Sequence, residues 1–356
     1  MAFFVSNFAI AQFDFLPQGS QKASVSQQIG NTDVTIVYSR PSVNNREIWG
    51  ALVPYGMNNL GFGTAKESPW RAGANENTVF KTTHDVTIGG KTLPAGKYGL
   101  HMIVNEDDTA TIIFSKNYEA WGSYFYDPAD DALRVDVETK EIPHVEQLTY
   151  GFDQVGPNSA TVYLSWEKKQ IPFIIETDVT KNVLAEIRQQ LQSSPGFNRQ
   201  SWEQAAGYAL NNGGDLNEAL GWINAAIEGQ FFSQKSFANL STKAQILERQ
   251  GKTAEAKAVM DEALTLGSVF EVHAYGRQLI AQGKKDQALD VFKWNAKKYK
   301  GTWPVDFGLA RGYSAVGNYK TALKHLKIAE GRAPDAANRN AIAAYIPKLE
   351  QGEDIN

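Results

Sequence analysis

The sequence predicts an α+β multidomain protein: an N-terminal antiparallel β-sandwich or barrel-like domain, followed by a C-terminal all-α, tetratricopeptide-like helical solenoid. Short runs that alternate polar with β-branched or aromatic residues fill residues 20–177. Turn signals such as Gly89-Gly90 separate these runs. From residue 178 onward the apolar residues recur with helical spacing instead. The length of 356 residues suits two domains of ordinary size.

Charge and composition exclude several classes of protein. The formal net charge is -4 with both signs interspersed, so no basic stripe is available to bind nucleic acid. Cysteine is absent, which excludes disulfides, thiolate zinc sites and a cysteine nucleophile. After the first residues no apolar run reaches the roughly 20 residues that a membrane span needs. We therefore expect neither nucleic-acid binding nor a membrane span.

The first residues resemble a secretory signal. Residues 1–11 form a short apolar run that ends in Ala9-Ile10-Ala11, the small-x-small pattern that precedes signal cleavage. The basic segment that usually opens such a signal is missing, so either the true start lies upstream or the segment is only an apolar tail. We expect the first, a truncated signal peptide. This pattern predicts an extracytoplasmic location, periplasmic or secreted, for a soluble protein.

Six runs predict the main strands of the first domain. They read TDVTIVYS from Thr32, YGLHMIV from Tyr98, TATIIFS from Thr109, LRVDVET from Leu133, SATVYLSW from Ser159 and IPFIIET from Ile171. No helical period lies between them, which favours an antiparallel architecture.

A linker helix follows the strands, over residues 178–198. Val179, Val183, Leu184, Ile187 and Leu191 fall on one helical face. Asp178 precedes this face and is a suitable N-cap, because its carboxylate can accept a bond from a free backbone N–H of the first turn.

The remaining sequence repeats itself. Gly214, Gly251, Gly283 and Gly317 each follow a helix pattern, at spacings of 37, 32 and 34 residues. Five positions after each glycine stands an alanine: Ala219, Ala256, Ala288 and Ala322. Seven positions before each glycine stands a small residue: Gly207, Ala244, Gly276 and Ala310. Nine positions after each glycine stands a large apolar residue: Ile223, Met260, Phe292 and Leu326. This agreement resembles the tetratricopeptide pattern of paired helices. We predict four repeats over residues 199–335.

The repeat pattern has a physical reason. Small residues are needed where two helices cross closely, the glycine ends the first helix in a left-handed conformation, and the large residue fills the space between repeats. Residues 336–351 then predict a capping helix that covers the last repeat.

Four segments of the first domain carry a resemblance: YSRP from Tyr38, VPYG from Val53, WRAGANE from Trp70 and LPAGKY from Leu93. With these segments in this order, the sequence from roughly Gln21 to Glu167 resembles an uncharacterised family of bacterial extracytoplasmic β-domains. Because the function of that family is unknown, the resemblance implies a domain and a compartment but no reaction. Residues 57–69 look like an insertion and are expected to form a surface loop.

The same segments supply candidate ligand-binding residues: Arg40, Arg46, Trp49, Tyr55, Trp70, Arg71, Asn75 and Glu76. In one interpretation the aromatic residues line a shallow pocket, and an Arg71–Glu76 pair with the Asn75 amide orients a sugar or a peptide. In the other, Arg71 and Glu76 pair with each other or with loop carbonyls and brace the connections between strands, where Gly73 only supplies a turn.

We expect no metal site and no cofactor. His84, His101 and His144 have no metal-binding spacing, and His273 and His325 look like ordinary repeat-surface positions. The acidic loop from Asp127 to Asp131 lacks the glycine and distal glutamate of a helix-loop-helix calcium site. No nucleophile elbow, metalloprotease helix or phosphate-binding loop is present, so we assign no catalytic residue.

Two functions compete. The first is a non-enzymatic interaction or scaffold protein that binds a protein or peptide through the solenoid, with Trp202 and Trp303 as candidate contacts. In the second, the β-domain is a carbohydrate- or peptide-binding module or a hydrolase, with Glu76 as acid or base and Arg71 as clamp. We favour the first.

Overall fold

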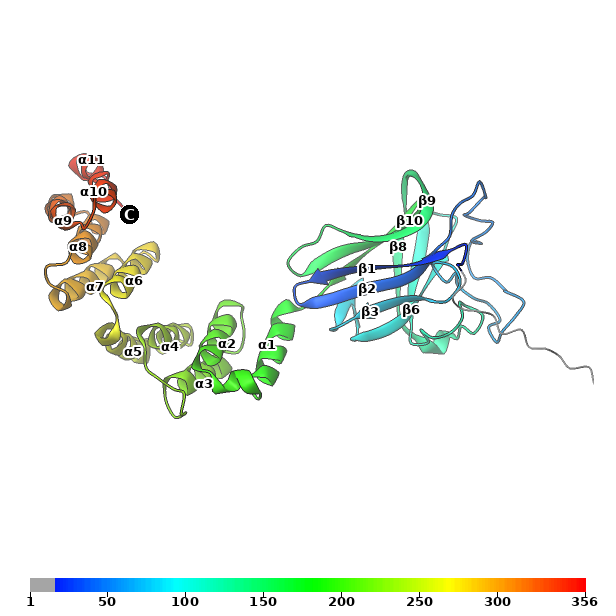
Figure 1. Ribbon diagram of the computed structural model, residues 1–356, viewed down its shortest axis with the longest axis horizontal. Helices are drawn as coiled ribbons and strands as arrows, with labels where there is room; N and C mark the ends of the chain where they lie inside the picture. The colour runs from blue at the N-terminus through cyan, green and yellow to red at the C-terminus, as the bar shows by residue number, and fades with distance from the viewer. Residues whose placement is uncertain (1–16) are drawn as a thin grey trace, which may run out of the picture. The chain divides into compact units, whose positions relative to one another are not determined.

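The structure is a computed structural model, and it describes residues 17–356 (Figure 1). The signal peptide predicted for residues 1–11 lies outside these residues. The chain forms two compact units, one ending at Ala185 and the other running from Glu186 to Asn356. Within the described part, none of the helices has the length and hydrophobicity that a membrane crossing requires.

The first unit contains two antiparallel sheets. One has the strand order β1-β2-β3-β6-β7-β8 and the other β5-β4-β10-β9. The strands are β1 (Gln21–Ile29), β2 (Thr32–Arg40), β3 (Thr78–Thr82), β4 (Val86–Ile88), β5 (Lys91–Leu93), β6 (Gly96–Val104), β7 (Thr109–Ser115), β8 (Asp131–Glu138), β9 (Lys140–Asp153) and β10 (Ser159–Glu176).

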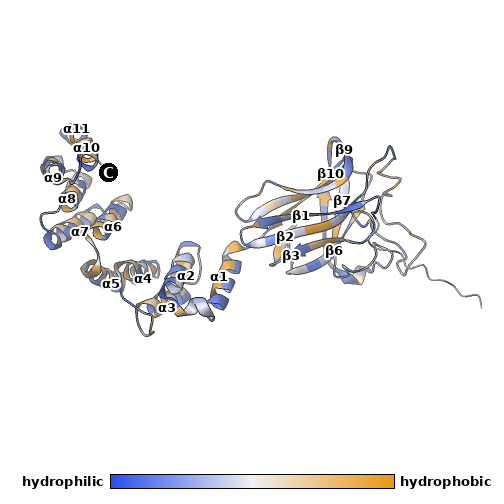
Figure 2. Cartoon of the chain, in the orientation of Figure 1, coloured by the Kyte–Doolittle hydropathy of each residue, from blue (hydrophilic) through white to orange (hydrophobic). Residues whose placement is uncertain are grey.

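Alternation along the strands builds the core of this unit. Alternate residues along most of β2 are buried, because successive side chains of a strand point to opposite faces of the sheet. Figure 2 shows both hydrophobic and hydrophilic residues along the strands of this unit. The Phe114 ring on β7 contacts Phe80 on β3 and Phe173 on β10, at centroid distances of 5.0 and 5.9 Å. These rings belong to one cluster that draws on both sheets, so the sheets pack as a sandwich.

Helix α1 (Val179–Gln190) follows β10 directly. The Asp178 carboxylate accepts a hydrogen bond from the Lys181 backbone N–H at 2.9 Å, which caps the first turn. The Asn182 amide donates to the hydroxyl groups of Thr32 and Thr177 at 3.3 and 3.0 Å. This buried contact attaches the start of α1 to the first unit, and the division between the units falls inside the helix.

The second unit consists of successive helix pairs (Figure 1). A short 3-10 helix, Ser194–Phe197, precedes them. The pairs are α2 (Arg199–Asn211) with α3 (Leu216–Ile227), α4 (Phe237–Arg249) with α5 (Thr253–Leu266), α6 (Val269–Ala281) with α7 (Lys285–Lys298), and α8 (Trp303–Ala315) with α9 (Tyr319–Arg332). The predicted fold class, antiparallel β-structure followed by tetratricopeptide-like helices, is confirmed.

A left-handed glycine follows the first helix of every pair. Gly251, Gly283 and Gly317 have φ values of 78, 77 and 80°. In the first pair the left-handed residue is Gly213, with φ of 76°, and the prediction that Gly214 takes this role was wrong. The reason is one extra residue in this turn, since α3 begins three positions after Gly213 whereas the later second helices begin two positions after their glycine.

Close packing explains the small residues of the repeat. Phe292 on α7 is completely buried. A Cβ added to Gly276 would lie 2.6 Å from its ring, and Cβ atoms added to Gly308 and Gly312 on α8 would lie 2.6 and 2.9 Å away. The ring therefore fits a space that exists only because three backbone positions carry no side chain.

The C-terminal segment forms two helices, where the sequence suggested one capping helix. They are α10 (Ala336–Ala343) and α11 (Ile346–Glu350). Pro347 lies in the first turn of α11 and has no N–H for a continuous helix, which favours a new start. Residues 351–356 then turn back, and the buried Ile355 joins the cluster formed by α8, α9, α10 and α11.

Candidate functional site

Arg71 is held in place by its neighbours. Its guanidinium donates to the Asn75 carbonyl at 2.6 Å and lies 5.0 Å from the centroid of the Tyr124 ring. A Cβ added to Gly122 would come within 2.3 Å of the Arg71 Cζ atom, so the guanidinium lies against bare backbone. These contacts fit the bracing interpretation, in which the arginine bonds to a loop carbonyl.

Asn75 and Glu76 take different partners. The Asn75 amide donates to the Ser20 carbonyl at 2.9 Å, and Ser39 Oγ donates to Glu76 at 3.4 Å. Among the described residues no ion pair joins Arg71 to Glu76. Asn75 has a φ of 59°, an uncommon backbone state that an asparagine tolerates better than most residues.

Glycine in this loop serves close packing. A Cβ added to Gly73 would lie 2.6 Å from Thr78 Oγ1 and 3.3 Å from the Ser39 carbonyl oxygen. Its φ is not positive, so Gly73 is needed for space and not for an unusual turn. Next to it, the carbonyl of the buried Ala72 accepts hydrogen bonds from Thr78 Oγ1 and Tyr150 Oη at 3.0 and 2.9 Å. The loop is fixed from several sides.

The candidate aromatic residues differ in exposure. Trp49 and Trp70 are partly buried and pack on the buried Trp166, at centroid distances of 6.1 and 6.0 Å. Tyr55 is 38% exposed and lies over Gly50, where an added Cβ would meet its ring at 2.9 Å. The two tryptophans contribute to the sandwich core, and only Tyr55 presents much of its ring to solvent.

Arg40 and Arg46 bond to main-chain groups. Arg40 donates to the Leu148 carbonyl at 2.9 Å and to Thr149 Oγ1 at 2.7 Å, which connects β2 to β9. Arg46 is exposed and donates to the carbonyls of Ser42 and Val43 at 2.5 and 3.0 Å. Whether any of the candidate residues in this unit contacts a ligand remains a prediction.

His101 makes a buried contact that the sequence did not indicate. Its Nδ1 lies 2.9 Å from Ser123 Oγ, and both residues are almost completely buried. Burial, with a smaller contribution from the charge of Arg71, lowers the pKa of His101 to about 4. A neutral, buried imidazole beside a hydroxyl acts here as an internal hydrogen-bonding group.

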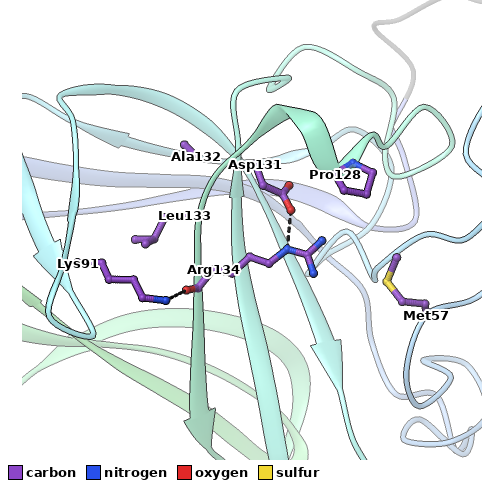
Figure 3. A pocket seen from close by; sticks show the side chains of 7 residues that line it. All are labelled: Met57, Lys91, Pro128, Asp131, Ala132, Leu133 and Arg134. Carbon is purple, nitrogen blue, oxygen red and sulfur yellow. Dashed lines mark hydrogen bonds and ion pairs between the residues drawn. The ribbon is translucent and has the colours of Figure 1, made fainter.

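A hollow of about 700 Å³ lies elsewhere in the first unit (Figure 3). Asp131 Oδ2 accepts hydrogen bonds from Tyr126 and from Arg134 Nε at 2.7 and 2.6 Å. Lys91 donates to the Arg134 carbonyl at 3.1 Å. Lys91, Asp131 and Arg134 therefore already bond to protein groups, although Asp131 Oδ1 has no hydrogen-bond partner among the described residues.

The acidic loop beside this hollow is similarly engaged. The Asp127 carboxylate accepts from the Ala129 N–H at 2.9 Å and caps the short 3-10 helix Pro128–Asp130. Over residues 17–356, no three His, Asp or Glu side chains gather in a way that could hold a metal ion.

Trp202 belongs to an aromatic patch in the second unit. Its indole N–H donates to the Gly196 carbonyl at 2.8 Å, and its ring stacks on Phe232 at 6.3 Å. Phe231 and Phe197 extend the patch and are 82% and 67% exposed.

Trp303 belongs to a second surface, which we call the α6–α8 face. It consists of side chains at helical spacing on the first helices of two pairs: Phe270, His273 and Arg277 on α6, and Trp303, Phe307, Arg311 and Ser314 on α8. Trp303 lies 6.3 Å from the Phe270 ring and 6.5 Å from the Phe307 ring. Phe270 is 60% exposed.

Two cations lie along the α6–α8 face. The Arg311 guanidinium lies 4.6 Å from the centroid of the Phe307 ring and 5.4 Å from that of Tyr345, and Arg277 is exposed. His273, expected at an ordinary repeat-surface position, is only partly exposed. Its Nδ1 lies 3.2 Å from the Pro304 carbonyl, and burial together with the charge of Arg311 lowers its pKa to about 4.

The second expected surface histidine also has internal partners. His325 stacks on Tyr313 with centroids 5.7 Å apart and lies 3.2 Å from Asp306. It is only partly exposed, because the ring lies between the two helices of the last pair.

Comparison with known proteins adds to this description. Residues 20–175 match the family described as Protein of unknown function (DUF2911). The match spans less than half of the chain and assigns no reaction or ligand. At this level, the resemblance of the first unit to a family of unknown function is confirmed. No curated protein matches the chain.

Several solved structures resemble the chain weakly. YrrB, described as a TPR protein with an unusual peptide-binding site, is 16% identical over 46% of this chain and 84% of its own, with a TM-score of 0.29. A tetratricopeptide repeat protein from Parabacteroides merdae is 15% identical over 49% of this chain and 70% of its own, with a TM-score of 0.31. A thermophilic TPR protein from Thermus thermophilus is 18% identical over 48% of this chain and 91% of its own, with a TM-score of 0.28. Similarities of this size carry no argument about partners, and the architecture of this chain rests on its own helix pairs.

Proposed function

We propose that this protein is a non-enzymatic interaction protein that binds a protein or peptide partner through its helix pairs. The observation that carries the proposal is the α6–α8 face, where aromatic and cationic side chains line up along two first helices. Phe270 and Arg277 are exposed, Trp303 and Phe307 are partly exposed, and Arg311 is buried beside them. The apolar run near Ala9–Ala11 supports an extracytoplasmic location for this activity.

The chemistry of the face suits an extended peptide. Aromatic rings such as Trp303 and Phe307 bury a large area with few rotatable bonds, which is why they are enriched at binding hot spots. Arg277 and Arg311 add positive charge beside the rings, so the preferred partner carries carboxylates. The patch around Trp202 and Phe231 offers a second apolar contact on the same unit.

For the β-unit we propose a supporting role. Arg71 and Asn75 donate to backbone carbonyls, and Trp49 and Trp70 pack in the core, so these groups brace the loops of the sandwich. Nothing in this arrangement favours Glu76 as an acid or base, since among residues 17–356 its one side-chain partner is the Ser39 hydroxyl at 3.4 Å.

A peptide array tests the proposal. Arrayed extended peptides of varied charge are probed with the labelled full chain and with its Trp303→Ala and Arg277→Glu variants. We expect the wild-type chain to retain a subset rich in acidic and apolar residues, and both variants to lose most of it.

Two controls make the result specific. Trp121→Ala removes a tryptophan that is 51% exposed on the β-unit and should leave the retained subset unchanged. Phe231→Ala shows whether the Trp202 patch contributes. The proposal fails if no peptide is retained, or if the Trp121 variant loses the same peptides as the Trp303 variant.

A further inference from the structure

The chain's own residues 353–356 lie on one end of the α6–α8 face. Ser314 Oγ donates to the Asp354 carboxylate at 2.7 Å and accepts from the Ile355 N–H at 3.1 Å. The Asn356 amide donates to the Arg311 carbonyl at 3.1 Å. The Ile355 side chain is 4% exposed and enters the apolar cluster below the face.

Arg311 is incompletely satisfied by this segment. It is only 8% exposed, yet no ion pair involves it among residues 17–356. Its terminal nitrogens make long contacts of 3.3 to 3.5 Å with the Ile355 carbonyl, Asn356 Oδ1 and Tyr345 Oη. Its Nε is buried without a partner. A buried cation with these weak contacts leaves room for a better acceptor, and a carboxylate suits a guanidinium best.

We propose that residues 353–356 occupy a binding site for an extended partner segment in which an acidic residue precedes a branched aliphatic residue, and that the partner binds by displacing them. This inference rests on the proposed function and specifies its ligand. The seated residues define the chemistry: an acidic side chain at Ser314, a buried aliphatic side chain, and a backbone carbonyl facing Arg311.

Charge on the face supports an acidic ligand. Burial raises the pKa of Asp354, but hydrogen bonds from Ser314 and Asn356, with a smaller contribution from the charge of Lys285, lower it overall. Burial, with a smaller contribution from the charge of Arg277, lowers the pKa of Arg311. A longer segment in trans can also contact the Phe270 ring, which is 60% exposed. A longer partner segment therefore gains contacts that the chain's own segment lacks.

The test compares the full chain with a variant that ends after Gly352. The probe is a fluorescent peptide that reproduces residues 352–356, and the readout is fluorescence anisotropy. We expect the shortened chain to bind the peptide at least about tenfold more tightly than the full chain, because its site is empty. Probe peptides with Asp→Asn or Ile→Ser at the positions of Asp354 and Ile355 should bind weakly.

A second variant guards against loss of folding. Ile355→Ser in the full chain weakens the seated segment without shortening the chain, and circular dichroism shows whether each variant keeps its helices. We expect this variant to bind the probe with intermediate affinity. The inference is overturned if the full chain and both variants, once shown to be folded, bind the probe with equal affinity, or if none of them binds it. Residues 353–356 would then be part of the fold of the last helix pair. Retention of other peptides on the array would still support the proposed function, so the two failures are distinguishable.

Discussion

The guanidinium of Arg311 lies 4.6 Å from the centroid of the Phe307 ring, and among residues 17–356 no carboxylate forms an ion pair with it. Burial lowers the pKa of this arginine from its ordinary value. A buried cation held by rings and neutral oxygens contributes little to folding. Its place in the α6–α8 face suits recognition of an anionic segment.

Replacement of this arginine should cost little stability. We expect Arg311→Met to change the free energy of unfolding by less than about 1 kcal/mol, or to raise it, because an apolar side chain of similar length avoids burying a charge. The measurement is chemical denaturation.

A matched arginine on the same helix pair should behave differently. Arg332 donates to the buried Asp306 carboxylate at 2.6 Å. Arg332→Met leaves this carboxylate with only the His325 contact, so we expect a loss of about 1–3 kcal/mol. Equal losses for the two arginine variants would contradict this account of Arg311.

Arg71 and Gly122 should be energetically coupled. Gly122 has a φ of 62°, and an added Cβ would lie 2.3 Å from the Arg71 Cζ atom. We expect Gly122→Ala to lose about 1–2 kcal/mol from the left-handed backbone and about 1–3 kcal/mol from the clash. In an Arg71→Ala background the clash disappears, so a double-mutant cycle should show a coupling of about 1–3 kcal/mol.

Gly90 is the control for this cycle. Its φ is 74°, and nothing lies within 4 Å of an added Cβ. Gly90→Ala should therefore lose only the stability that the left-handed backbone costs an alanine, and the loss should be the same in the wild-type and in the Arg71→Ala protein. Absence of coupling between Arg71 and Gly122 would mean that the arginine does not brace this loop.

The two equivalent glycines Gly276 and Gly207 should respond in opposite directions. Gly276→Ala places a Cβ 2.6 Å from the Phe292 ring, so we expect a loss of about 1–3 kcal/mol. Gly207→Ala meets nothing within 4 Å and removes a helix-interior glycine, so we expect a gain of about 0.5–1 kcal/mol. Thermal unfolding of both variants checks this, and destabilisation by Gly207→Ala would refute the packing account.

His101 and His273 should make stability depend on pH. The pKa values of His101 and His273 are lowered to about 4, below the ordinary 6.5, so the unfolded chain binds more protons between these values. Their stabilising contribution is complete above pH 6.5 and is lost as the pH falls toward 4, by up to about 3 kcal/mol each.

Denaturation between pH 7 and 4 measures this effect. His101→Gln in the first unit and His273→Gln in the second should each reduce the slope of the unfolding free energy against pH. This holds whatever stability each variant loses at neutral pH. His144→Gln, on an exposed strand position, is the control. An unchanged slope in both variants would show that the histidines titrate normally.

Much of the helical architecture could be predicted because tight packing restricts residue size. Positions such as Gly276, Ala310 and Phe292 recur at fixed offsets since the space between helices allows few alternatives. The error at Gly214 has a local cause, an extra residue in the first turn that keeps α3 in phase but shifts the left-handed position to Gly213.

The sites could be predicted only in part. Trp303 was a candidate contact, but Arg311 and Phe270 were not. The helical spacing shows which residues share a face of a helix, but it does not show which faces the rest of the chain covers. The partners of Arg71 in the 122–124 segment lie about fifty positions away in sequence, and no local pattern links them. The placement of residues 353–356 likewise depends on a chain reversal after α11.

The most direct test of the central claim is hydrogen–deuterium exchange on the full chain with and without the peptide that the array retains most strongly. The account predicts slower exchange in α6 and α8, residues 269–281 and 303–315, with residues 17–185 unchanged. Protection confined to residues 17–185, with α6 and α8 unaffected, would contradict it and place binding on the β-unit.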